Sequence, residues 1–120
     1  MRKTLIIGAS IKPERYAFKA AHRLKATGHS IVLVGKNEGE VAGEPILTDQ
    51  QDVPKDIDTI TLYVGPQHQA EWQDYVLKIK PKRVIFNPGT ENLAFENLLK
   101  EHQIEAIEAC TLVMLSVGTY

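Results

Sequence analysis

The residues best suited to bind a ligand gather just after the first apolar run of the chain. Gly8, Ala9 and Ser10 end this run, and the cations Lys12 and Arg15 follow closely. Backbone N–H groups beyond Gly8, the Ser10 hydroxyl and two positive side chains are donors of the kind that hold phosphate oxygens. We therefore predict a phosphate site in this loop. The alternative is a plain strand-to-helix turn in which both cations are solvated.

A further cation, Lys36, follows the second apolar run. Folds that bind NAD usually carry an acidic residue near the end of the second strand, where it holds the ribose hydroxyls. A lysine there suits a ribose that bears a phosphate, which means the 3′-phosphate of coenzyme A or the 2′-phosphate of NADP. Gly8 also stands alone, without the other glycines of the G-x-G-x-x-G pattern, which argues against an ordinary nicotinamide enzyme. A solvated lysine in a loop is the alternative interpretation.

Two side chains could do more than bind. His68, near the start of a predicted helix, could hold a ribose or pantetheine group or act as a base. Cys110, after the last predicted strand, could form a mixed disulfide or be acylated, although a lone cysteine is more often a small buried residue. The sequence offers no evident base for Cys110 and no paired carboxylates for acid and base work. The histidines lack metal-ligand spacing, so we predict neither a catalytic pair nor a metal site.

Strands alternating with amphipathic helices must position these residues. Apolar runs predict strands at residues 4–7, 31–34, 60–64, 84–86 and 104–107. Helical periodicity predicts helices from Pro13 to Gly28, between Pro66 and Pro81, and from about Glu91. This alternation is typical of a parallel sheet that is covered on both faces. We therefore predict an α/β fold for a single domain over residues 1–120, a doubly wound, Rossmann-like αβα sandwich with five parallel strands.

The stretch from 36 to 57 is the irregular part, because glycine and proline interrupt it. It could carry a short strand around Pro45–Leu47 and a helical turn near Gln50–Val53. The apolar segment 111–117 fits either a terminal helix or a strand. In an open parallel sheet, ligands bind where the carboxyl ends of strands meet the amino ends of helices, so we expect the site at that edge.

Composition narrows the partners. The chain has 120 residues, a net charge of −1 and a pI near 6.4, which gives no general attraction to nucleic acid or to an anionic membrane. No apolar run approaches the roughly 20 residues that cross a bilayer. A single cysteine excludes an internal disulfide framework. We expect a cytoplasmic protein with a small-molecule ligand, and a protein partner or homo-oligomer stays open.

The order of these motifs resembles that of the small stand-alone CoA-binding domain proteins, relatives of the CoA-binding domain in the α-subunit of succinyl-CoA synthetase. The resemblance spans nearly the whole chain and rests on stretches that follow one another in the same order, namely Leu5–Ser10, Lys12–Tyr16, Thr27–His29, Val41–Pro45 and Asp52–Pro54, with Cys110 near the end. It implies a Rossmann-type fold that binds coenzyme A or an acyl derivative.

Carried over by position, the resemblance also implies a set of site residues. Gly8, Ala9, Ser10, Lys12 and Arg15 would hold the pyrophosphate, Lys36 would meet the ribose phosphate, and Val64, Pro66 and Asn87 would border the nucleotide or the pantetheine. With His68 added, this set predicts a module that binds or senses coenzyme A without chemistry of its own. The alternatives are a small enzyme on an acyl-CoA or nucleotide substrate, using His68 or Cys110, and an NADP-responsive or purely structural domain.

Overall fold

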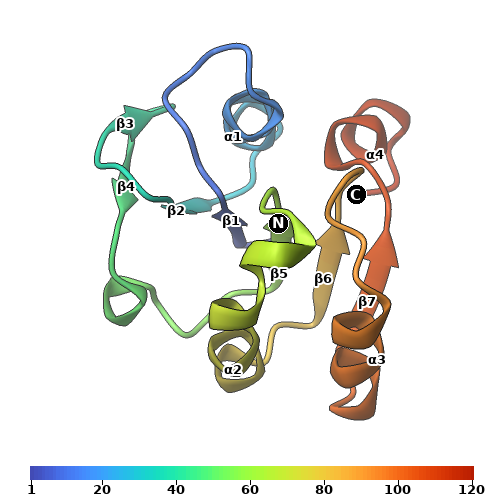
Figure 1. Ribbon diagram of the computed structural model, residues 1–120. Coiled ribbons are helices and arrows are strands. Elements are labelled where there is room, and N and C mark those ends of the chain that lie inside the picture. The colour runs from blue at the N-terminus through green and yellow to red at the C-terminus, as the bar shows by residue number, and fades with distance from the viewer.

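The computed structural model describes residues 1–120, and its centre is a seven-stranded sheet in the order β3-β4-β2-β1-β5-β6-β7. The strands are β1 (Thr4–Ile7), β2 (Ile31–Val34), β3 (Glu40–Val41), β4 (Glu44–Leu47), β5 (Thr59–Leu62), β6 (Arg83–Phe86) and β7 (Glu105–Glu108). The helices are α1 (Tyr16–Ala26), α2 (Ala70–Ile79), α3 (Leu93–Glu101) and α4 (Thr111–Val117). Helices α1 and α4 lie on one face of the sheet, and α2 and α3 lie on the other, so the predicted three layers are confirmed (Figure 1).

The predicted number of five strands is wrong, because the irregular stretch forms a hairpin that adds two. The short strand expected near Pro45 is β4, which pairs parallel with β2, whereas β3 pairs antiparallel with β4. The sheet is therefore mostly, not wholly, parallel. The two turn residues, Ala42 and Gly43, both have positive φ angles of 54° and 81°, as in the tight turns that join hairpin strands. The sequence alone resembles a loop here, because glycine and proline are frequent in this stretch, and the tight turn at Ala42 and Gly43 is what brings β3 and β4 together.

Helix boundaries follow the predicted signals with one correction. The first helix begins at Tyr16 rather than at Pro13, because Arg15 has an extended backbone and its N–H donates to the Lys12 carbonyl in a turn. Its end agrees with the prediction, since Gly28 adopts a φ of 92° just beyond the last turn. A 3₁₀ turn at Gln50–Asp52 confirms the helical turn expected there. The ambiguous terminal segment is helix α4, and no helix is long and apolar enough to span a membrane.

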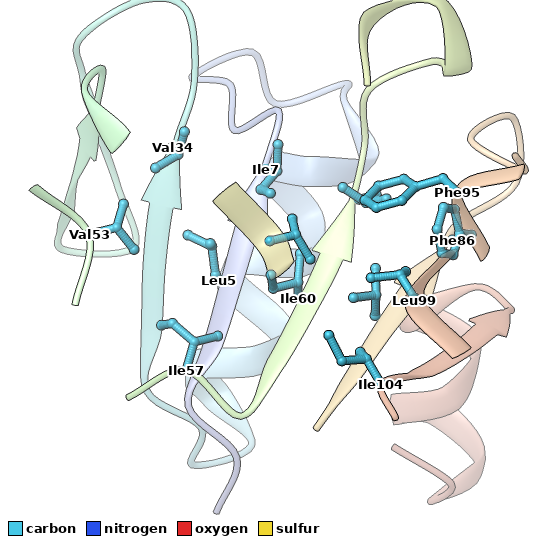
Figure 2. Packing of buried hydrophobic residues seen from close by; sticks show 13 residues of the cluster. Leu5, Ile7, Val34, Val53, Ile57, Ile60, Phe86, Phe95, Leu99 and Ile104 are labelled. Atoms are coloured by element: carbon cyan, nitrogen blue, oxygen red, sulfur yellow. The ribbon is translucent and has the colours of Figure 1, made fainter. Parts of the chain in front are cut away.

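The pleat of β1 divides the core between the two faces of the sheet. Leu5 and Ile7 point into the cluster covered by α2 and α3, and Ile6 points into the cluster covered by α1. Figure 2 shows the first cluster, in which the rings of Phe86 and Phe95 meet edge to face with centroids 5.6 Å apart. Each fully buried aliphatic side chain of this kind contributes about 1.5–3 kcal/mol to folding, so β1 is anchored on both sides.

The strand order reverses beside β1. The chain runs outward from β1 through β2 to β4, and then crosses back to place β5 on the other side of β1. The loops that leave β1 and β5 therefore diverge to opposite faces of the sheet and leave a crevice between them. Ligands of open α/β sheets bind at such a switch point.

Candidate functional site

A cavity of about 560 Å³ opens at this switch point, where the loops after β1, β2 and β5 meet. We call it the large lobe, and its lining consists of Gly8, Ala9, Ser10, Ile11, Lys12, Arg15, Lys36, Asn37, Glu38, Ile46, Tyr63, Val64, Gly65 and His68. Eight of the ten predicted site residues are in this lining. The other two, Pro66 and Asn87, are not.

Pro66 and Asn87 have other positions. Pro66 is exposed and begins a 3₁₀ turn, Pro66–His68, ahead of α2. Asn87 is buried, and its amide nitrogen donates to the Thr61 hydroxyl at 2.6 Å and to the Leu62 carbonyl at 2.8 Å. Its amide oxygen accepts from the Thr111 N–H at 2.9 Å. Asn87 therefore joins β6 to β5 and to the start of α4, and its polar atoms are already engaged within the protein.

A second cavity of about 240 Å³, the small lobe, adjoins the first. It is lined by Gly8, Ser10, Arg15, Tyr16, Ala17, Tyr63, Gly65, Pro88, Gly89 and Thr90. Half of this lining also lines the large lobe, so the two cavities share a wall made of Gly8, Ser10, Arg15, Tyr63 and Gly65. The predicted site residue Asn87 precedes this lining directly, and the residues that follow it, Pro88, Gly89 and Thr90, are the ones that line the small lobe.

Two glycines bring the loops of the site into contact. Gly8 has a φ of 96°, and a Cβ atom there would lie 3.0 Å from both the carbonyl carbon and the oxygen of Tyr63. At Gly35 a Cβ atom would lie only 2.5 Å from the Ala9 carbonyl oxygen. Side chains at these positions would push the loops after β1, β2 and β5 apart, so the floor of the site depends on both glycines.

The backbone donors of the first loop are not all free for a ligand. The N–H groups of Gly8 and Ala9 both donate to the Val34 carbonyl, at 3.0 and 2.9 Å. The N–H groups of Ser10 and Ile11, one step further along, have no acceptor within the protein. The part of the loop that can bind a phosphate is therefore shifted beyond Gly8.

The amino end of α1 lies where the two lobes join. Arg15 precedes the helix and makes no side-chain cap, and the N–H groups of Tyr16, Ala17 and Phe18 have no acceptor within the protein. The first turn contains no acidic residue. Unpaired N–H groups and the helix dipole give this end a partial positive charge that attracts anions.

Three cations surround the large lobe. Lys12, Arg15 and Lys36 are exposed, and none of them takes part in an ion pair within the chain. Glu38 is the one acidic residue in the lining, and sequence reasoning missed it. The rim after β2 thus carries a positive charge at Lys36 and a negative charge at Glu38. A carboxylate is therefore available there to bind a ribose hydroxyl, in addition to the lysine.

Other lining residues missed from the sequence owe their places to the fold. Ile46 reaches the large lobe because β4 pairs with β2, and Ile11 and Asn37 lie next to predicted residues. Tyr63 follows β5 and lines both lobes. Burial raises the pKa of Tyr63 to about 12, and its buried hydroxyl has no hydrogen-bond partner.

The two candidate reactive residues, His68 and Cys110, differ in their access to the cavities. His68 is exposed at the rim of the large lobe, and its side chain has no hydrogen-bond partner within the protein. Cys110 is half-buried just before α4 and lines neither lobe. The geometry of the site is that of a crevice with cations around it, unpaired backbone donors and a side cavity whose one charged lining residue is Arg15.

Comparison with known proteins agrees with this architecture. A crystal structure of an uncharacterised protein shares 52% identity over 100% of this chain and 98% of its own, with a TM-score of 0.97. A hypothetical protein from Pyrococcus horikoshii shares 26% identity over 97% of this chain and 82% of its own, with a TM-score of 0.88. A conserved hypothetical protein from Pyrococcus furiosus shares 25% identity over 94% and 98%, with a TM-score of 0.82.

A search of curated proteins found no match. The model of the CoA binding domain family matches residues 2–116, which is nearly the whole chain. The Rossmann-like sheet and the cavity at its switch point agree with this match, which shows that the chain belongs to the CoA binding domain family.

Proposed function

We propose that this protein binds coenzyme A or an acyl-CoA in the crevice at the carboxyl ends of β1, β2 and β5, and that it does so without chemistry of its own. The observation that carries the proposal is the meeting of the unpaired amino end of α1 with three unpaired cations at two adjoining cavities that share Arg15. Coenzyme A carries three phosphate groups, and the family match makes it the first ligand to consider.

The phosphates would divide between two parts of the site. The diphosphate suits the junction of the lobes, where the N–H groups of Ser10 and Ile11 and the amino end of α1 are unpaired. Arg15 lines both lobes there and offers a bidentate donor for phosphate oxygens. The ribose phosphate suits Lys36 at the rim after β2, and Glu38 beside it can accept a hydrogen bond from a ribose hydroxyl or an adenine amine.

Binding rather than catalysis follows from the placement of the reactive groups. A nucleophilic Cys110 would have to reach a substrate in a cavity that it does not line. His68 lacks the second group that would orient it as a base. We therefore infer that the protein holds its ligand for another molecule or responds to its concentration.

Isothermal titration calorimetry on ligand-stripped protein tests the proposal. We expect saturable binding of coenzyme A and acetyl-CoA, and weaker binding of NADP, NAD and ATP. The variant Lys36→Glu should weaken coenzyme A by at least about tenfold, because a charge reversal removes an attraction and adds a repulsion. Lys55→Glu, at an exposed lysine outside both lobes, is the control and should bind like the wild type.

Two results would refute the assignment. If neither coenzyme A nor acetyl-CoA gave a heat of binding, coenzyme A would not be the ligand. Tighter binding of NADP than of coenzyme A would show that the ligand with the phosphorylated ribose is NADP instead.

A further inference from the structure

One buried side chain, Gln69, holds two loops of the small lobe together. Gln69 is 0% exposed and lies directly before α2. Its amide nitrogen donates to the Val64 carbonyl at 3.0 Å and to the Thr90 carbonyl at 2.7 Å, and its amide oxygen accepts from the Asn92 side chain at 3.0 Å. The bonds to Thr90 and Asn92 join the loop after β5 to the turn after β6, and the Gln69 amide makes both of them.

The turn after β6 is rigid at its other contacts. The Thr90 hydroxyl donates to the Asn87 carbonyl at 2.8 Å, and Asn87 is itself bonded to β5. Asn92 accepts from the Phe95 N–H at 3.1 Å and so caps α3. These contacts hold the turn to β5 and to α3, but neither joins it to the Val64 backbone. The amide nitrogen of Gln69 donates to both the Val64 and the Thr90 carbonyl, so it sets the distance between these two residues.

The small lobe differs in chemistry from the large one. Arg15, at the junction, is its one charged residue, and the rest of its lining is glycine, alanine, proline, serine, threonine and tyrosine. The large lobe contains Lys12, Lys36 and Glu38 in addition. A ligand with a charged nucleotide at one end, phosphates in the middle and an uncharged arm at the other end would match both lobes and the junction.

We propose that the small lobe is the subsite for the uncharged arm of the ligand, and that Gln69 is a positioning residue that sets the width of this subsite. The inference rests on the proposed function and adds to it which part of the ligand each lobe holds. Gln69 lines neither lobe, so it acts through the backbone of Val64 and Thr90. Its loss should therefore affect the arm and spare the nucleotide.

Calorimetry with two probes separates these effects. Coenzyme A carries the arm, and adenosine 3′,5′-bisphosphate is the nucleotide end without it. In the 120-residue chain, Gln69→Met keeps the length of the side chain and removes its hydrogen bonds. We expect about tenfold weaker binding of coenzyme A, which corresponds to one net hydrogen bond, and affinity for the bisphosphate within about twofold of the wild type.

Two further variants complete the test. Gln73→Met changes a glutamine of α2 whose side chain makes no hydrogen bond, and it should bind both probes normally. If Gln69→Met does not fold, Asn92→Asp removes the donor to the Gln69 amide oxygen and keeps the oxygen that caps α3. Asn92 lines neither lobe, and the same selective loss is expected.

Each outcome decides between the possibilities. Equal weakening of both probes would show a general structural role, and unchanged binding of coenzyme A would show that Gln69 positions nothing that the ligand needs. Equal affinity of the wild type for both probes would mean that the small lobe adds nothing and would overturn the subsite. Failure of both probes to bind the wild type would instead refute the proposed function itself.

Discussion

Replacing Gly8 with alanine should damage the floor of the site more than the same change at a glycine of similar backbone conformation. Gly8 has a φ of 96°, and the new Cβ atom would lie 3.0 Å from the backbone of Tyr63 and 3.1 Å from the Val64 side chain. Gly28, the control, has a φ of 92°, and its one neighbour closer than 3 Å is the end of the exposed Met1 side chain. The pair separates the cost of the dihedral angle from the cost of the contact.

The dihedral angle costs both variants about 1–2 kcal/mol, because an alanine side chain disfavours positive φ. At Gly8 the Cβ atom meets main chain, which cannot rotate away, and overpacking of this kind adds about 1–3 kcal/mol. A domain of this size loses about 3–6 °C of melting temperature per kcal/mol. Gly8→Ala should therefore melt about 6–12 °C below Gly28→Ala, if the added cost is about 2 kcal/mol.

Thermal unfolding followed by circular dichroism, with urea unfolding at 25 °C as a check, measures this difference. Coenzyme A titrations on the folded fraction should also show weaker binding for Gly8→Ala and unchanged binding for Gly28→Ala. Equal melting temperatures for the two variants would refute the reasoning, because they would show that the loops after β1 and β5 separate without cost.

Two further changes test polar groups around the site. The hydrogen bond and negative charge of Glu96 raise the pKa of Glu108, so this group favours folding when it is protonated and loses that contribution as pH rises through the raised pKa. Glu108→Gln should therefore raise the melting temperature at pH 7, and scans from pH 4 to 8 should show the difference from the wild type closing in acid. A constant difference would contradict the raised pKa of Glu108. Asn87→Leu leaves the Thr111 N–H and the Leu62 carbonyl unpaired in the core and should cost about 3 kcal/mol in urea unfolding, whereas a loss below about 1 kcal/mol would show that these groups find other partners.

Much of the fold was predictable because its signals are local. The buried runs at β1, β2 and β6 are short, rich in β-branched residues and followed directly by glycine or asparagine, so each indicates a parallel strand and its end. The run at β5 predicts the strand but not its end, because β5 stops at Leu62, before Tyr63 and Val64. Gly28 ends α1 for a reason that concerns only its own dihedral angles. The hairpin of β3 and β4 was only partly predictable, because it depends on two consecutive positive φ angles, one of them at an alanine.

The position of the site was also predictable, but not all of its residues. Any parallel α/β sheet brings the carboxyl ends of its central strands to one edge, and so Ser10, Lys12 and Lys36 could be grouped from their places after two strands. Glu38 and Ile46 could not be, because their approach depends on how the chain turns back into β4. The family resemblance placed Asn87 at the ligand, yet its amide is hydrogen-bonded to Thr61 and Thr111 inside the protein.

The sequence by itself determined the layers, the edge of the sheet at which a ligand would lie, and the cations available there. The tertiary structure alone decided which donors are free and how the crevice is divided. The Val34 carbonyl occupies the N–H groups of Gly8 and Ala9, and Gln69 connects two loops that lie 21 residues apart in the chain. Such contacts follow from distances between segments that fold separately, and a local pattern of residue types carries no information about those distances.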